Sequence, residues 1–165
     1  MRDREFNTGE PLAYFLTWTT YGTWLPGDDR GSWQQGAYLP ANELFHDMAA
    51  SKMKEVELIL DCDDRAIVER TIARHCDIRN WPLHASNART NHVHVVVTAP
   101  GYDPETVRDQ FKAWCTRKLK PMHSTRKCFW TEGGSCRWIN READLEAAIV
   151  YVRDAQDLKG KDLQA

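Results

Sequence analysis

The sequence lacks any long apolar segment: none of its apolar runs approaches the roughly 18 residues that span a bilayer. Residues 1–10 are charged and contain no apolar stretch, so we expect no secretory signal. The five cysteines are odd in number, and none of them belongs to a CxxC pair. This pattern argues against a zinc ribbon and against a disulfide framework. Together these absences predict a cytoplasmic protein with no membrane partner.

The length and composition are those of one globular domain. The chain has 165 residues, of which 42% are hydrophobic and 28% charged, far from the composition of a disordered chain. A chain of this size can bury roughly 70% of its unfolded surface, which is enough for a substantial core. No internal repeat or low-complexity linker divides the sequence. We therefore expect a single domain over residues 1–165.

Charge is segregated along the chain, although the net charge is only −2. Residues 106–141 contain nine basic and two acidic residues, whereas residues 43–64 contain two basic and seven acidic ones. Trp114, Trp130 and Trp138 lie within the basic segment. Because bases stack on aromatic rings and phosphates attract cations, this segment predicts a surface for single-stranded nucleic acid. A solvated helix face is the alternative interpretation.

Hydrophobic periodicity predicts an α+β domain with the order β-α-β-β-α-β-α. Strands are expected over residues 14–21, 82–88, 92–99 and 135–140. A first helix is expected to begin at a cap on Asp63 or Asp64 and to end at about residue 79. A second is expected over residues 104–121. A third should run from about residue 141 to 157, with Asn140 as its cap. Residues 30–60 are harder to assign, with a short helix expected within 44–60. Two apolar stripes should face the core: Ile67, Val68, Ile72 and Cys76, and then Leu145, Ala148, Ile149 and Val152. This order is ferredoxin-like (RRM-like), an antiparallel sheet with helices packed on it.

His92 and His94 are two residues apart in the strand expected over residues 92–99. Residues two apart in a strand point to one face, with Cα atoms about 6.5 Å apart. Two neutral imidazoles at this spacing can bind one divalent cation. Two histidines on a half-exposed sheet face, with no metal, are the alternative.

Two families that also use an HxH pair do not fit. Cupin-type sites need a carboxylate a few residues after the second histidine, but residues 95–98 are Val-Val-Val-Thr. The two-histidine phosphoesterases need two copies of His-x-Thr/Ser, and neither His92 nor His94 begins such a motif.

The segment TNHVHVVV, which begins at Thr90, resembles the histidine–hydrophobic–histidine motif of the single-tyrosine HUH transposases. Three other segments resemble the same family in the same order: FLTWTTYGTWLPGD from Phe15, FKAWCTRKLK from Phe111 and AIVYVRDAQ from Ala148. The resemblance is to the REP-associated tyrosine transposases and their domesticated relatives. It spans a core of about residues 14–157 and implies the HUH endonuclease fold.

This resemblance implies a nucleophilic tyrosine on the last helix, which is Tyr151. It also implies cleavage of single-stranded DNA beside a folded repetitive hairpin, with a 5′-phosphotyrosine and a free 3′-hydroxyl as products. A divalent ion, Mg²⁺ or Mn²⁺, held by His92 and His94 would polarise a phosphate oxygen. Strand transfer then needs no nucleotide cofactor, and the chain has no GxxxxGK motif. Tyr21, at the end of the first strand, is the rival nucleophile.

The third metal ligand departs from the pattern of many relatives, which place an amide or carboxylate one helical turn after the tyrosine. Here Ala155 stands four residues after Tyr151. Gln156, five residues after it, resembles the glutamine of the branch with the TWLPGD loop. On a regular helix Gln156 lies about 140° from Tyr151, so a shared metal requires fraying or a bulge. Asp154, about 60° away, is the geometric competitor.

If DNA binds, the expected contacts come from Lys112, Arg117, Lys118, Lys120 and Trp114. The other tyrosines, Tyr14, Tyr38 and Tyr102, are expected to pack or to stack on bases, and His84 is expected to be structural. The expected partner is single-stranded or hairpin DNA, and both a monomer and a homodimer remain open. A non-catalytic nucleic-acid-binding domain and a metal-dependent nuclease that uses water are the competing functions.

Overall fold

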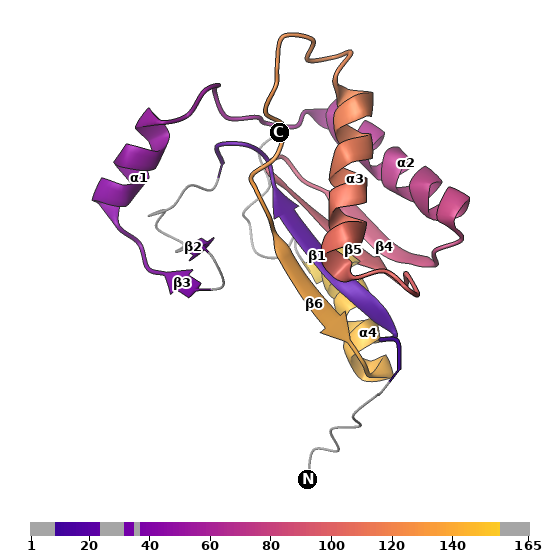
Figure 1. The fold of residues 1–165 in the computed structure, drawn as a ribbon. Coiled ribbons are helices and arrows are strands. Elements are labelled where there is room, and N and C mark those ends of the chain that lie inside the picture. Colours follow the sequence, from indigo (N-terminus) through magenta and orange to yellow (C-terminus); the bar gives the residue numbers. More distant parts are fainter. Residues whose placement is uncertain (1–8, 24–31, 35–36, 156–165) are drawn as a thin grey trace.

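The fold is built on a four-stranded antiparallel sheet, seen in a computed structural model that describes residues 9–23, 32–34 and 37–155 (Figure 1). Its strand order is β4-β5-β1-β6. The strands are β1 (Ala13–Thr19), β4 (Leu83–Ala88), β5 (His92–Val97) and β6 (Ser135–Ile139). The first strand therefore lies between the third and the fourth strands of this sheet, which is the ferredoxin-like arrangement predicted from the sequence.

Helices cover both faces of the sheet. Figure 1 shows α2 (Cys62–Arg79) and α3 (Pro104–Leu119) in front of it, with α4 (Glu142–Val150) behind. A π-helical turn, η1 (Tyr151–Ala155), follows α4 directly. Because side chains alternate along a strand, each sheet face carries its own apolar cluster.

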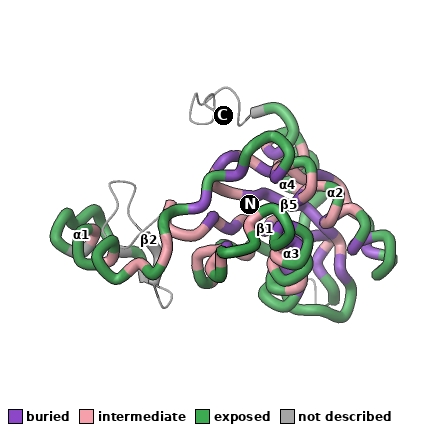
Figure 2. The backbone as a smooth tube through the Cα atoms, turned by 90° about the horizontal axis from the view of Figure 1, so that it is seen from above, coloured by how far each residue is buried: buried purple, intermediate pink, exposed green. Residues whose placement is uncertain are grey.

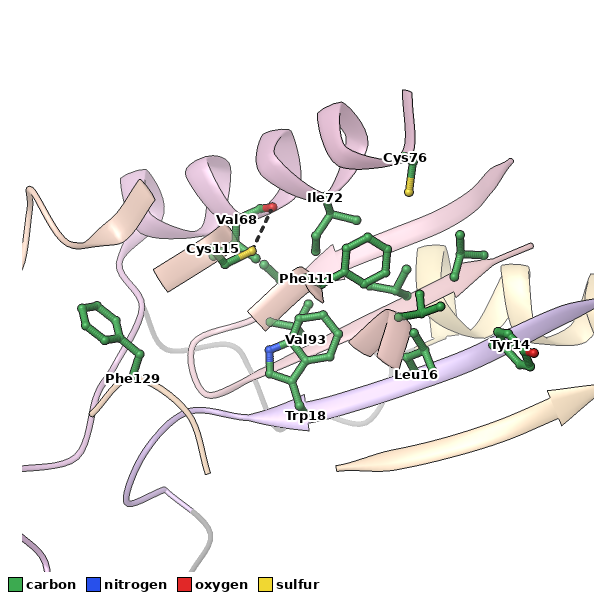
Figure 3. Packing of buried hydrophobic residues seen from close by; sticks show 14 of the residues in the cluster. Tyr14, Leu16, Trp18, Val68, Ile72, Cys76, Val93, Phe111, Cys115 and Phe129 are labelled. Carbon is green, nitrogen blue, oxygen red and sulfur yellow. Dashed lines mark hydrogen bonds between the residues drawn. The ribbon is translucent and has the colours of Figure 1, made fainter. Parts of the chain in front are cut away.

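The larger cluster lies under α2 and α3. Leu16, Trp18 and Val93 project into it from the sheet, and the Trp18 ring stacks on Phe111 of α3 (Figure 3). The smaller cluster, under α4 and η1, contains the buried residues Ala13, Ala85, Val96, Ile139 and Val152. The predicted stripes of both helices are confirmed, since their members pack in these two clusters.

The N-cap of α2 corrects the sequence prediction. The cap is Asp61, not Asp63 or Asp64: its carboxylate accepts a hydrogen bond from the Asp64 backbone N–H at 2.8 Å. In return the Asp64 carboxylate accepts from the Asp61 N–H at 3.2 Å. Such a capping box requires an acceptor three residues after the cap, and this places Asp63 and Asp64 inside the first turn. Asn80, with a φ of 56°, ends the helix in the left-handed conformation.

The last helix differs from prediction at both ends. Arg141 occupies the N-cap position without a side-chain cap bond, so Asn140 does not cap the helix. The Arg141 guanidinium pairs instead with the Asp144 carboxylate at 2.9 Å. Regular α-helix stops at Val150, and the backbone widens into η1 over Tyr151–Ala155. The rest of the predicted helix, residues 156 and 157, lies outside the described residues.

A small arm precedes α2 and stands to one side of the main body (Figure 2). It contains the β2–β3 hairpin (Ser32–Gln34 and Ala37–Leu39), which the sequence did not predict, and α1 (Glu43–Ser51), the short helix expected within residues 44–60. Glu55 connects the end of the arm to the main body, because its carboxylate accepts hydrogen bonds from the backbone N–H groups of Lys127 and Cys128. In the described part of the chain, no helix has both the length and the apolar character needed to cross a membrane.

Candidate active site

The two histidines of the HxH pair lie side by side on β5, on the sheet face covered by α4 and η1. Their ring centroids are 4.7 Å apart. His94 is buried and His92 is half-buried. The prediction that the two side chains share one face is confirmed.

A neutral neighbour holds the Nδ1 atom of each histidine. The Thr17 hydroxyl lies 2.7 Å from Nδ1 of His94, and Thr17 is the direct partner of His94 in the β1–β5 pairing. The Asn91 amide oxygen accepts from Nδ1 of His92 at 2.7 Å. With each Nδ1 engaged in this way, the Nε2 atoms are the ones suited to bind a metal, as in known histidine metal sites with an outer hydrogen bond. The two residues therefore fit a divalent cation.

Burial keeps His94 uncharged. Desolvation, followed by the nearby charges of His92 and Arg89, lowers the pKa of His94 to about 3. The Phe15 ring stacks on it with centroids 5.5 Å apart. An imidazole with this pKa is neutral near pH 7, which is the form that ligates metals.

Tyr151 lies against this pair. Its ring packs edge-on against His94, with centroids 5.8 Å apart, and against Phe15 at 6.1 Å. Tyr151 is the first residue of η1 and is half-buried, while the next residue, Val152, is fully buried in the smaller cluster. The fold thus brings together the tyrosine and the histidines, which are more than fifty residues apart in the sequence.

The described residues supply no complete set of metal ligands. In the described ranges, no group of three His, Cys, Asp or Glu residues could hold a metal ion, so Asp154 does not complete a site with the histidines. Asp154 is exposed. Gln156, the other predicted third ligand, lies outside the described residues. The π-helical turn at Tyr151–Ala155 is nevertheless a bulge of the kind that this prediction required.

The rival nucleophile, Tyr21, belongs to a different part of the surface. Its hydroxyl oxygen accepts from the Lys54 backbone N–H at 3.0 Å. Its ring lines a cavity of about 500 Å³ that is shared with Thr116 of α3, Phe129 and Trp130. Tyr151, not Tyr21, is therefore the tyrosine packed against the HxH pair.

The residues predicted to touch DNA lie on or next to α3, on the sheet face opposite the histidines. Two of the lysines are engaged with a loop: Lys112 donates to the carbonyls of Thr131 and Gly133, and Lys120 donates to the Arg126 carbonyl. Burial, followed by the charge of Arg108, lowers the pKa of Lys112. The other three are exposed: Trp114, Arg117 and Lys118. The Arg117 guanidinium lies over the Trp114 ring, 4.7 Å from its centroid.

His84 and Tyr14 make the structural contacts expected of them. His84 on β4 lies 2.7 Å from the hydroxyl of Thr98, the residue that follows β5. Tyr14 is buried, and its hydroxyl donates to the Tyr102 carbonyl at 2.7 Å. These contacts join β4 to the end of β5, and β1 to the loop before α3.

Sequence reasoning missed the residues around the histidines: Phe15, Thr17, Asn87 and Asn91. Asn91 is adjacent to His92, so a local signal for it existed. Phe15 and Thr17 reach the site only through the β1–β5 register, and Asn87 only through the β4–β5 register. No periodicity within one strand predicts such a pairing.

Comparisons with known proteins support the fold. No protein-family model matches the sequence, and no curated protein matches it. A solved structure of a REP-associated tyrosine transposase bound to a REP hairpin superposes with a TM-score of 0.55 at 13% sequence identity. The match covers 99% of this chain and 76% of that chain. The chain therefore shares the fold of that transposase, an antiparallel sheet with helices packed on it.

Proposed function

We propose that the chain is a metal-dependent endonuclease and strand transferase for single-stranded DNA at repetitive hairpin elements. The observation that carries this proposal is the contact of Tyr151 with His94, 5.8 Å between ring centroids, beside a second histidine. A tyrosine next to paired imidazoles places a nucleophile beside two possible metal ligands, which suits covalent phosphoryl transfer with a metal. We expect the protein to act on DNA in the cytoplasm.

Each residue has a distinct part in the proposed reaction. His92 and His94 would hold Mg²⁺ or Mn²⁺ through Nε2, with Gln156 as the proposed third ligand. The chemistry supplied at this site would be polarisation of a non-bridging phosphate oxygen. The Tyr151 hydroxyl loses its proton and its oxygen attacks phosphorus, while the bond from phosphorus to the 3′ oxygen breaks. The leaving oxygen takes up a proton, which gives a 5′-phosphotyrosine and a free 3′-hydroxyl.

The proposed DNA contacts come first from the exposed part of α3. Trp114 offers a ring for base stacking, and Arg117 and Lys118 offer unburied positive charges for phosphates. Lys112 and Lys120 were also predicted to bind DNA, but their ammonium groups already donate to loop carbonyls. We expect a smaller contribution from these two lysines.

A DNA-binding domain without catalysis is the second candidate. One observation favours it: the described residues provide two imidazoles for a metal but no third His, Cys, Asp or Glu. The fold and the exposed basic residues serve this function equally well. A covalent intermediate separates the two candidates.

The experiment compares wild type with Tyr151→Phe on a pool of labelled stem-loop oligonucleotides with randomised single-stranded flanks, in Mn²⁺. Wild type should form a protein–DNA adduct that survives denaturing electrophoresis. Tyr151→Phe removes one oxygen and should abolish the adduct while DNA binding and folding are retained.

Tyr21→Phe is the matched control and should form the adduct normally. Adduct formation by Tyr151→Phe at the wild-type rate would show that another residue is the nucleophile. Cleavage by wild type without any adduct would indicate a nuclease that uses water. Binding without cleavage by wild type would support the DNA-binding domain.

A further inference from the structure

We infer that Asn87 positions Tyr151 against the histidines, an inference that rests on the proposed function. The Asn87 side-chain amide donates from Nδ2 to the backbone carbonyl of Val152, at 2.9 Å. Val152 directly follows Tyr151 in η1. Asn87 is a positioning residue in this account, because it acts through the backbone beside the nucleophile.

The strand register places Asn87 next to the metal-binding pair. Asn87 of β4 and His94 of β5 are direct partners in the antiparallel ladder. Direct partners point to the same face with Cβ atoms about 4.5–5.5 Å apart. The hydrogen bond from Asn87 thus connects the residue paired with His94 to Val152, the residue that follows Tyr151. The separation of nucleophile and metal ligand depends on this link.

A β-bulge turns Asn87 toward η1. The β4–β5 register shifts between Leu83 and Ala85, so His84 is the extra residue. Leu83 packs against the cluster under α2 and α3, whereas Ala85 belongs to the cluster under α4. Regular alternation would keep residues 83, 85 and 87 on one face. The bulge moves residues 85 and 87 to the other face, as bulges beside active sites do.

The Asn87 bond adds a backbone restraint to the side-chain packing of η1. The Val152 side chain is fully buried, which fixes how deeply it inserts into the smaller cluster. The hydrogen bond from Asn87 fixes the position of the Val152 backbone carbonyl. On a regular helix a shift of one residue turns a side chain by about 100°. Such a turn would carry the Tyr151 hydroxyl away from the His92–His94 pair. A neutral amide suits this task, because a carboxylate here could ligate the metal and a cation would repel it.

The test uses Asn87→Ala and Asn87→Leu, with Asn140→Ala as control. Asn140 is an exposed asparagine just before α4, at the opposite end of the same helical segment. Under single-turnover conditions with saturating stem-loop DNA and Mn²⁺, both Asn87 variants should form the covalent adduct about tenfold more slowly, the effect of removing one hydrogen bond. DNA affinity should stay within about twofold of wild type, since Asn87 acts through the η1 backbone and not on DNA. Asn140→Ala should match wild type in both measurements.

Amide hydrogen exchange on the DNA-free protein provides a second readout. Residues 151–155 should exchange faster in the Asn87 variants but not in Asn140→Ala. If wild type forms no adduct, the proposed function fails, and amide exchange alone then decides whether Asn87 holds η1. An unchanged adduct rate in both Asn87 variants, or a parallel loss of rate and DNA affinity, would overturn the inference. If Asn87→Ala does not fold, Asn87→Leu, which keeps the branched shape of the asparagine side chain, provides the same comparison.

Discussion

The Nδ1 atoms of both histidine rings at the candidate site contact neutral groups, Thr17 and Asn91. A neutral partner orients the ring without adding negative charge next to the phosphate that the proposed reaction would cleave. Desolvation has already lowered the pKa of His94 to about 3, so protonation does not compete with metal binding near pH 7. His94 is therefore in the protonation state that the proposed metal binding requires.

The first expectation at these residues concerns the metal. His94→Ala should abolish cleavage while hairpin binding is largely kept, because phosphate contacts away from the metal carry most of the affinity. Chelator-treated wild type should regain cleavage when Mg²⁺ or Mn²⁺ is added, measured by release of a labelled strand. Full cleavage by His94→Ala in the presence of chelator would contradict a role for the metal.

Among the helices and strands, irregular positions set the geometry of the site. The bulge at His84 changes the sheet face to which the later residues of β4 point. The change from α-helix to π-helix falls at Tyr151, the proposed nucleophile. A π-helical turn inside an α-helix is rare and is frequently found at functional sites. α2, by contrast, is a regular helix with a capping box at its start.

The cap of α2 leads to a prediction about stability. Asp61→Ala removes the acceptor for the Asp64 N–H and should cost about 1 kcal/mol. For a domain of this size the corresponding fall in Tm is roughly 2–4 °C. Asp63→Ala, in the same exposed first turn, is the control and should change Tm less. Equal losses in the two variants, measured by thermal unfolding, would show that charge at the helix start matters and the cap does not.

In the molecule as a whole, the sheet separates the exposed basic part of α3 from Tyr151 and the histidines. A DNA strand that contacts both regions has to pass around an edge of the sheet. Under the proposed function, DNA binding and chemistry therefore take place on different faces of the sheet. It follows that substitutions on α3 should change affinity without changing the rate constant of the chemical step.

The double variant Arg117→Gln/Lys118→Gln tests this separation. The slope of log affinity against log salt should flatten by about one unit for each phosphate that the variant no longer neutralises. The rate of adduct formation at saturating DNA should remain at the wild-type value. Lys52→Gln/Lys54→Gln, on two exposed lysines of the acidic segment, should leave the slope unchanged. Binding that is independent of salt, or equal for duplex and hairpin, would indicate that the α3 charges are only solvated.

Features that depend on local periodicity could be predicted from the sequence. Alternation within one strand put His92 and His94 on one face, and helical spacing identified the apolar stripes of α2 and α4. The order of the elements was sufficient to predict the ferredoxin-like sheet, because few topologies accommodate a split β-α-β unit. The resemblance to HUH transposases singled out Tyr151, which lies at the histidines.

The residues that surround the HxH pair, and the face that each element presents, depend on long-range packing and could not be predicted from local patterns. Thr17 reaches His94 through a strand pairing across 77 residues of sequence, and Asn87 reaches it through a pairing that depends on a bulge. A one-residue change of register reverses the face of every later side chain in a strand. Long-range packing also explains why Lys112 donates a hydrogen bond to a loop carbonyl. It likewise places α3 on the sheet face opposite the histidines. Residue type and spacing encode what a segment can form, whereas its partners depend on the packing of the whole chain.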